Sequence, residues 1–142
     1  MEKPEEEKKK IMVIDDNAFH HETITLILKD KYEVIPAMSG QAAIEMLLEG
    51  VDPDLILLDI VMPDMDGWVV HGRIKKLKPD TPVAFVSSVK GITEIFHSYS
   101  VGINDFITKP YIMEDLLQRI ETMIANSNKA SPGKSSREKK ET

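Results

Sequence analysis

The chain has 142 residues, 42% of them hydrophobic, a formal net charge of −6 and no cysteine. This length can bury the core of one domain, and the lack of cysteine excludes disulfides, thiolate metal sites and cysteine nucleophiles. No apolar stretch approaches the roughly 20 residues of a membrane span, and residues 1–10 are charged where a signal peptide would become apolar, so we expect a cytoplasmic protein without membrane contact.

The charge is distributed unevenly along the chain. Residues 129–142 hold five basic and two acidic residues, a net of +3, which leaves −9 for the rest. An acidic body lacks the basic face that binds a phosphate backbone, so we expect no direct nucleic-acid binding by this domain. We predict a flexible lead over residues 1–8, one folded domain over residues 9–126 and a disordered polar, basic tail over residues 127–142.

Apolar runs and helical spacing alternate along the chain, which predicts five strands that are each followed by a helix. The strands are expected at residues 10–14, 32–37, 55–58, 82–86 and 105–107, and the helices at residues 18–29, 41–48, 68–77, 91–101 and 112–125. Ser39 is a plausible N-cap, and Gly50 ends the second helix.

The third and fourth strands are unbroken apolar runs, which is typical of strands covered on both faces. Repeated strand and helix units with short crossovers give a parallel sheet with right-handed connections. We therefore predict an α/β fold of the flavodoxin-like, doubly wound class. It would have a five-stranded sheet of order 2-1-3-4-5, five helices and three layers.

Polar residues follow four of the predicted strands. Asp15 and Asp16 follow the first strand and Asp59 ends the third, while Ser87, Ser88 and Lys109 follow the fourth and fifth. In this architecture ligands bind outside the carboxyl ends of the strands, so these side chains should share one site.

Carboxylates crowded in this way repel one another and require a cation. An all-oxygen cluster suits magnesium or manganese better than zinc. Lys109 supplies a second positive charge, so the site would hold an anionic group, for which a phosphoryl group is the obvious candidate. Asp59 is the carboxylate best placed to be the nucleophile.

Four segments carry a resemblance to the receiver domains of two-component response regulators. They are residues 13–17 (VIDDN), 57–67 (LLDIVMPDMDG), 86–88 (VSS) and 108–110 (TKP), and the match extends over roughly residues 9–126. The resemblance implies that Asp59 accepts a phosphoryl group from the phosphohistidine of a sensor histidine kinase or phosphotransfer protein, or from a small phosphodonor. It implies a signalling phosphoacceptor that catalyses its own phosphorylation and slow dephosphorylation, and no enzyme in the usual sense.

The same resemblance implies a set of metal ligands. Asp16, Asp59 and the backbone carbonyl of Val61 would bind Mg²⁺ directly, with Asp15 acting through a water, and Mn²⁺ could substitute. The resemblance also implies roles for one lysine and two serines. Lys109 would pair with the transferred phosphoryl group, the Ser87 hydroxyl would donate a hydrogen bond to it, and the Ser88 backbone N–H would donate another.

The resemblance also predicts how phosphorylation is transmitted. Ser87 would move towards the phosphoryl group and Phe106 would follow it inward, by packing, because phenylalanine lacks the hydroxyl of the tyrosine often found there. Residues 91–125 would form the responsive face that binds a downstream protein or a second copy of the chain in a phosphorylation-dependent homodimer. The peptide bond before Pro110 is expected to be cis.

Val61 and Val89 lie two residues beyond Asp59 and Ser87, where side chains flank the path of hydrolytic water. Both are apolar and cannot orient a water molecule. We therefore predict a comparatively long-lived aspartyl phosphate.

Other interpretations of single features remain beside this one. Asp15 and Asp16 alone would be typical of a helix N-cap region. The histidines show no spacing that converges with the acids, and we interpret them as surface or helix-packing residues: His20, His21, His71 and His97. We interpret Gly67 as a source of backbone freedom in the turn after the third strand.

Three alternative functions share parts of the pattern. A magnesium phosphatase resembling the haloacid dehalogenase family needs a second aspartate where Val61 stands, and in a flavodoxin-type carrier the acids after the first strand would repel the flavin phosphate. A receiver used only as an interaction module, no longer phosphorylated, is disfavoured by the intact acids, Ser87 and Lys109. The sequence leaves open whether the chain is a stand-alone regulator or a segment of a longer one.

Overall fold

A parallel β-sheet forms the centre of the molecule in the computed structural model, which describes residues 8–62, 66–88, 102 and 104–127. Its five strands lie in the order β2-β1-β3-β4-β5, and every neighbouring pair is parallel. The strands are β1 (Lys9–Ile14), β2 (Tyr32–Ala37), β3 (Leu55–Asp59), β4 (Val83–Ser87) and β5 (Asp105–Thr108). The predicted class and strand order are confirmed.

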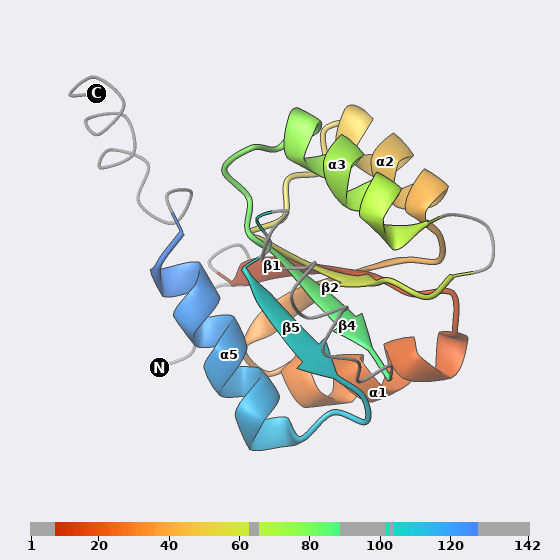
Figure 1. Cartoon of the computed structure of the whole chain (residues 1–142). Coiled ribbons are helices and arrows are strands. Elements are labelled where there is room, and N and C mark those ends of the chain that lie inside the picture. Colours follow the sequence, from red (N-terminus) through yellow and green to blue (C-terminus); the bar gives the residue numbers. More distant parts are fainter. Residues whose placement is uncertain (1–7, 63–65, 89–101, 103, 128–142) are drawn as a thin grey trace.

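Helices cover both faces of the sheet and complete three layers (Figure 1). The described helices are α1 (Ala18–Leu28), α2 (Gly40–Leu48), α3 (Gly67–Leu77) and α5 (Met113–Ala125). Helices α2 and α3 pack on one face, and α1 and α5 pack on the other. The helix predicted at residues 91–101 lies outside the described residues. Within the described ranges, no helix is both long enough and apolar enough to span a bilayer.

Strands β3 and β4 are buried at every position, and their side chains alternate between two cores. Leu57 and Val86 pack towards α1 and α5, whereas Leu58 and Phe85 pack towards α2 and α3. All five residues of β3 and all five of β4 are buried. This explains the unbroken apolar runs in the sequence. It also gives Asp59, the last residue of β3, a fixed position.

Short polar side chains begin three of the helices. The Oδ1 atom of Asn17 accepts hydrogen bonds from the N–H groups at the start of α1, Ser39 does the same for α2, and Asp66 for α3. The N-cap predicted at Ser39 is confirmed. Gly50 follows α2 with a φ of +109°, a left-handed conformation that glycine adopts without strain.

Gly67 has a different role from the one that we expected. Its φ lies outside the left-handed region, so no special backbone freedom is required there. A Cβ atom at this position would instead lie 2.6 Å from the Cα atom of Ile60, the residue that follows Asp59. Glycine is therefore present because α3 begins against the backbone of the loop after β3.

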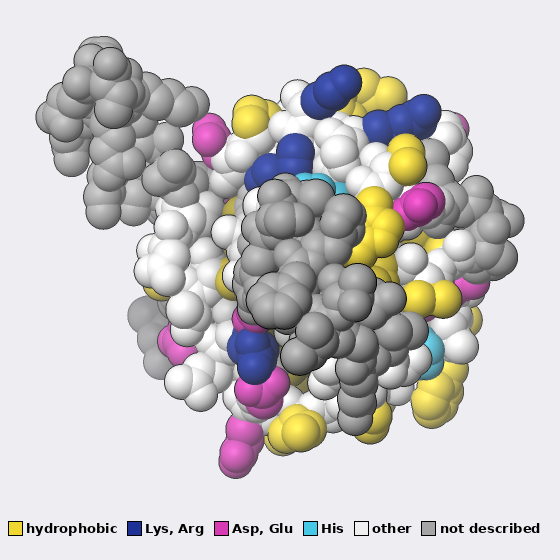
Figure 2. Space-filling model, viewed as in Figure 1, with side chains coloured by type: hydrophobic (Ala, Val, Ile, Leu, Met, Phe, Trp, Pro, Cys, Tyr) yellow, Lys and Arg dark blue, Asp and Glu magenta, His cyan; other side chains and the backbone are white. Residues whose placement is uncertain are grey.

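Charged side chains of both signs are visible on the face shown in Figure 2. Basic side chains gather over α3, which contributes Arg73, Lys75 and Lys76. Both lysines lie in the last turn of α3, where a positive charge interacts favourably with the helix dipole. This part of the acidic domain is consequently basic.

Candidate functional site

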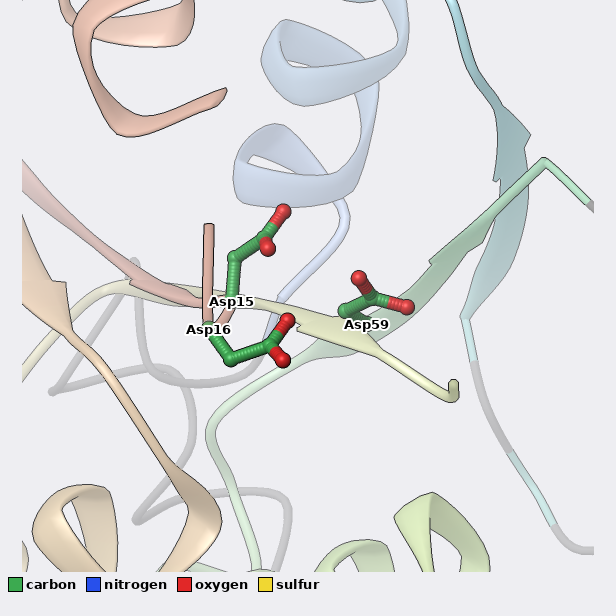
Figure 3. Close-up of side chains that lie close together, drawn as sticks. All are labelled: Asp15, Asp16 and Asp59. Carbon is green, nitrogen blue, oxygen red and sulfur yellow. The ribbon is translucent and has the colours of Figure 1, made fainter. Parts of the chain in front are cut away.

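Three aspartate side chains meet where the chain leaves β1 and β3, at the carboxyl edge of the sheet (Figure 3). Asp15 and Asp16 directly follow β1, and Asp59 ends β3. One carboxylate oxygen from each residue lies within 4.8 Å of those from the other two. Asp15 and Asp59 are buried, whereas Asp16 is exposed. The predicted convergence of the acids is confirmed.

Lys109 brings a positive charge into the acidic cluster from the end of β5. Its Nζ atom lies 2.7 Å from Oδ2 of Asp15 and 3.1 Å from Oδ2 of Asp59. The backbone N–H of Lys109 donates to the carbonyl of Ser87 at 3.0 Å, which ties the residue to the end of β4. The peptide bond between Lys109 and Pro110 is cis, as predicted.

A cavity of about 500 Å³ opens beside these residues. Ser87 is buried and Ser88 exposed at its wall, and the backbone N–H of Val61 donates to Oδ1 of Asp59 at 2.9 Å. The cavity brings together six predicted site residues, which are Asp16, Asp59, Val61, Ser87, Ser88 and Lys109. Their individual roles remain predictions.

The two buried carboxylates differ in pKa although they share Lys109. Burial would raise the pKa of Asp15, but hydrogen bonds from Lys109 and from the N–H of Asn17 outweigh it, and the pKa is lowered. Burial raises the pKa of Asp59, and the bonds from Val61 and Lys109 only partly oppose this. The negative charge of Asp15 adds to the increase. Of the two buried carboxylates, Asp59, which lines the cavity, is therefore the one that is harder to keep charged.

Tyr111, which also lines the cavity, is affected by the same negative charges. Burial raises the pKa of its hydroxyl, and the charges of Asp15 and Asp59 raise it further. The phenol therefore stays neutral and forms part of the cavity wall.

The donor set fits a hard divalent cation. The three clustered carboxylates offer only oxygen atoms, which Mg²⁺ and Mn²⁺ prefer over the nitrogen and sulfur ligands of zinc sites. Asp16 is exposed, so a cation held here would also be accessible to water. Lys109 alone provides one positive charge against three carboxylates, so a cation would complete the neutralisation.

Two histidines that we interpreted as surface or helix-packing residues contact the acidic cluster, which their sequence spacing did not indicate. Nδ1 of His20 lies 2.8 Å from Nζ of Lys109 and 3.2 Å from Oδ2 of Asp15. Nε2 of His21 lies 2.7 Å from the carbonyl oxygen of Asp15. Side chains in the first turn of a helix point back towards its N-terminus, and α1 begins just after the acids. The direction of side chains in the first helical turn would have predicted these contacts, whereas sequence spacing alone could not.

The other histidines lie away from the cluster or outside the described residues. His71 is buried in α3, with its ring 5.4 Å from the ring of Phe85 in an edge-to-face arrangement. Its interpretation as a helix-packing residue is confirmed. His97 and Val89 lie outside the described residues.

Ser87 and Phe106 lie on neighbouring strands and on the same face of the sheet. Phe85 is paired with Phe106 in the register of β4 and β5, and Ser87 follows Phe85 by two residues. Because side chains alternate along a strand, Ser87 and Phe106 share the face towards α2 and α3. Phe106 is buried in that core. This proximity is a necessary condition for the predicted coupling between the two residues.

Comparisons with known proteins identify the family of this chain. A family profile described as "Response regulator receiver domain" matches residues 11–121. The chain is 31% identical over 130 residues to "Probable transcriptional regulator ycf27" of Porphyridium aerugineum, covering 88% of this chain and 52% of that protein. It is 32% identical to "Transcriptional regulatory protein DltR" of Streptococcus agalactiae, covering 84% and 53%.

A solved structure agrees with the family profile. The CheY-like response regulator receiver domain protein of Methanospirillum hungatei is 27% identical, with a TM-score of 0.77, and the match covers 83% of this chain and 94% of that one. The chain spans about half the length of the curated relatives that it matches.

Proposed function

This chain belongs to the response regulator receiver domain family of two-component systems, and from that membership we propose that Asp59 is its phosphoacceptor. Receiver domains are signalling modules that interact with histidine kinases and output partners. The observation that carries the proposal is the position of Asp59. Among the three clustered carboxylates, it alone both lines the cavity and accepts a hydrogen bond from Lys109.

The attacking atom is an Asp59 carboxylate oxygen. Its Oδ1 atom is held by the N–H of Val61 and its Oδ2 atom by Lys109, so the carboxylate is oriented before a donor arrives. The new bond joins this oxygen to phosphorus, while the bond from phosphorus to the donor nitrogen or oxygen breaks. The leaving atom keeps the electron pair of that bond. The product is an acyl phosphate on Asp59.

Lys109, Ser87 and Ser88 stabilise the charge on the transferred phosphoryl oxygens. The ammonium of Lys109 can exchange its bond to Asp59 for one to the phosphoryl group, and the Ser87 hydroxyl and the Ser88 N–H supply further donors. Mg²⁺, or Mn²⁺ in its place, would be held by Asp16, Asp59 and the Val61 carbonyl, with Asp15 through a water, and would supply positive charge to the same oxygens.

The phosphodonor would be the phosphohistidine of a sensor histidine kinase or of a phosphotransfer protein. Phosphorylation would draw Ser87 towards the phosphoryl group and let Phe106 pack differently in the core behind it. The responsive surface would be residues 91–125, and its partner a downstream protein or a second copy of the chain. β5 and α5 form the described part of that surface.

Intact-protein mass spectrometry after incubation with acetyl phosphate and Mg²⁺ tests the proposal. The wild type should gain one phosphate, and Asp59→Asn should gain none. Leaving out Mg²⁺ or adding a chelator should also prevent the gain. Equal labelling of both proteins, or labelling of neither, would refute the proposal.

A further inference from the structure

The ammonium group of Lys109 has a full set of hydrogen-bond partners. It carries three N–H donors, and three acceptors surround it: Asp15 at 2.7 Å, His20 at 2.8 Å and Asp59 at 3.1 Å. Only 10% of the side chain is exposed, so water has little access to replace a missing partner. His20 therefore provides the third hydrogen-bond partner of an ammonium group that is almost fully buried in the site.

The contact with Lys109 indicates the tautomer of the His20 ring. Nδ1 cannot accept a hydrogen bond from Lys109 and donate one to Asp15 at the same time. Lys109 has no acceptor atom, so in this contact the ammonium donates and Nδ1 accepts. The proton of the neutral ring is then on Nε2, and the 3.2 Å approach of Asp15 to Nδ1 is a contact without a hydrogen bond.

Asp15 does not need His20 as a donor. Its Oδ2 atom accepts from Lys109 and its Oδ1 atom accepts from the N–H of Asn17 at 3.0 Å. Asn17 in turn caps α1 and accepts from the backbone N–H of His20 at 3.2 Å. The cap thereby fixes the turn that carries the histidine against the lysine.

We propose that His20 is a positioning residue for phosphoryl transfer to Asp59, because its Nδ1 atom holds the Lys109 ammonium by an uncharged acceptor. This inference rests on the proposed function. A third carboxylate at this position would compete with the phosphoryl group for the charge of Lys109, whereas a neutral imidazole holds one N–H and leaves that charge available. When Lys109 turns an N–H from Asp59 to the phosphoryl oxygens, the bond to His20 still limits its movement.

Paired amide substitutions separate this role from a merely structural one. The Oδ1 atom of Asn is bonded to Cγ, as Nδ1 of His is, so His20→Asn keeps an acceptor at the required distance from the backbone. His20→Gln places its amide one bond further out, and His20→Leu has no acceptor. Glu22→Leu, an exposed change on the same helix, serves as the matched control.

The rate constant for phosphorylation by acetyl phosphate should be measured at saturating Mg²⁺. We expect His20→Leu and His20→Gln to be slower by roughly fivefold, and His20→Asn and Glu22→Leu to lie within about twofold of the wild type. The Mg²⁺ concentration for half-maximal rate should not change, because His20 supplies no metal ligand. Equal rates for the Leu, Gln and Asn variants would overturn the inference, whether those rates are normal or reduced.

The lysine contact has a readout that does not depend on phosphorylation. Long-range ¹H–¹⁵N spectra of the imidazole at about pH 8 should show His20 with the proton on Nε2, and Lys109→Met should shift the Nδ1 resonance. A proton on Nδ1, or no shift in the variant, would refute the contact. If the spectra agree but the wild type takes no phosphate, the proposed function fails and the contact stands.

Discussion

Lys109 and His71 are largely buried basic side chains in two regions of the molecule, and their surroundings differ. Lys109 lies at the carboxyl edge of the sheet, and three acceptors satisfy its ammonium group. His71 is part of α3 and packs against Phe85 of β4, and in the part of the chain that the structure describes its Nε2 atom is buried without a hydrogen-bond partner.

The difference shows how each region tolerates a polar group. In the site, burial of charge is offset by opposite charges and hydrogen bonds, which are the groups needed for chemistry. In the α3 region, packing against Phe85 holds the ring in place, although its Nε2 atom is buried without a hydrogen-bond partner among the described residues. Substitutions in the first region should therefore change rates, and substitutions in the second should change stability.

The largest expected effect is on phosphorylation in Lys109→Met. The variant keeps a long side chain but loses the charge that faces Asp59, so the phosphorylation rate with acetyl phosphate should fall by about 100-fold or more. His71→Leu is the control from the other region and should stay within about twofold of the wild type. Similar losses in both variants, by mass-spectrometric time course, would break the distinction between the regions.

The next largest effect should be on stability in Gly67→Ala. The added methyl group would lie 2.6 Å from the Cα atom of Ile60, so α3 and the loop after β3 must separate. We expect a loss of about 2 kcal/mol in the free energy of unfolding, measured by urea denaturation. Gly72→Ala is the control, because a Cβ atom there would meet nothing within 4 Å and alanine favours the helix. A Gly67→Ala protein as stable as Gly72→Ala would contradict the close contact.

A smaller effect is expected on the lifetime of the phosphorylated protein in Val61→Asn. Val61 lines the cavity with 58% of its surface exposed and offers no group that orients water. An amide at this position could hold a water molecule near the acyl phosphate, so loss of phosphate should be several-fold faster. Val61→Ala removes bulk without adding a polar group. It therefore separates the effect of a water-orienting amide from the effect of a less covered site. No faster loss in Val61→Asn than in the wild type would count against the predicted persistence of the phosphate.

The sequence predicted the strands and the acidic cluster because both depend on strong local patterns. Unbroken apolar runs that end in Asp15 or Asp59 mark the ends of buried strands, and a parallel sheet brings such ends together. The contacts of His20 were missed because they depend on the direction of a side chain in the first turn of α1. The reason for Gly67 was missed because the approach of Ile60 is a tertiary contact without a local sequence pattern.

The smallest effect separates the two regions by pH. Burial lowers the pKa of His71, and the positive charge of Lys75, one turn further along α3, lowers it more. The unfolded chain binds a proton at this residue near the ordinary histidine value of 6.5, whereas the folded protein resists it. As the pH falls below 6.5, the unfolded state therefore binds more protons at His71 than the folded state does. The contribution of the neutral His71 ring to the free energy of unfolding is complete above pH 6.5 and is lost as the pH falls below it.

His71→Leu should remove this part of the pH dependence while it leaves the rest unchanged. Urea denaturation of wild type and variant between about pH 8 and pH 5.5 should show the difference in unfolding free energy shifting in favour of the variant as the pH falls. Carboxylates and the other histidines are present in both proteins, so their titration cancels in the difference. A constant difference across the pH range would mean that the buried His71 ring binds a proton as easily as it does in the unfolded chain. That outcome would contradict the burial of the ring against Phe85 without a partner for Nε2 among the described residues.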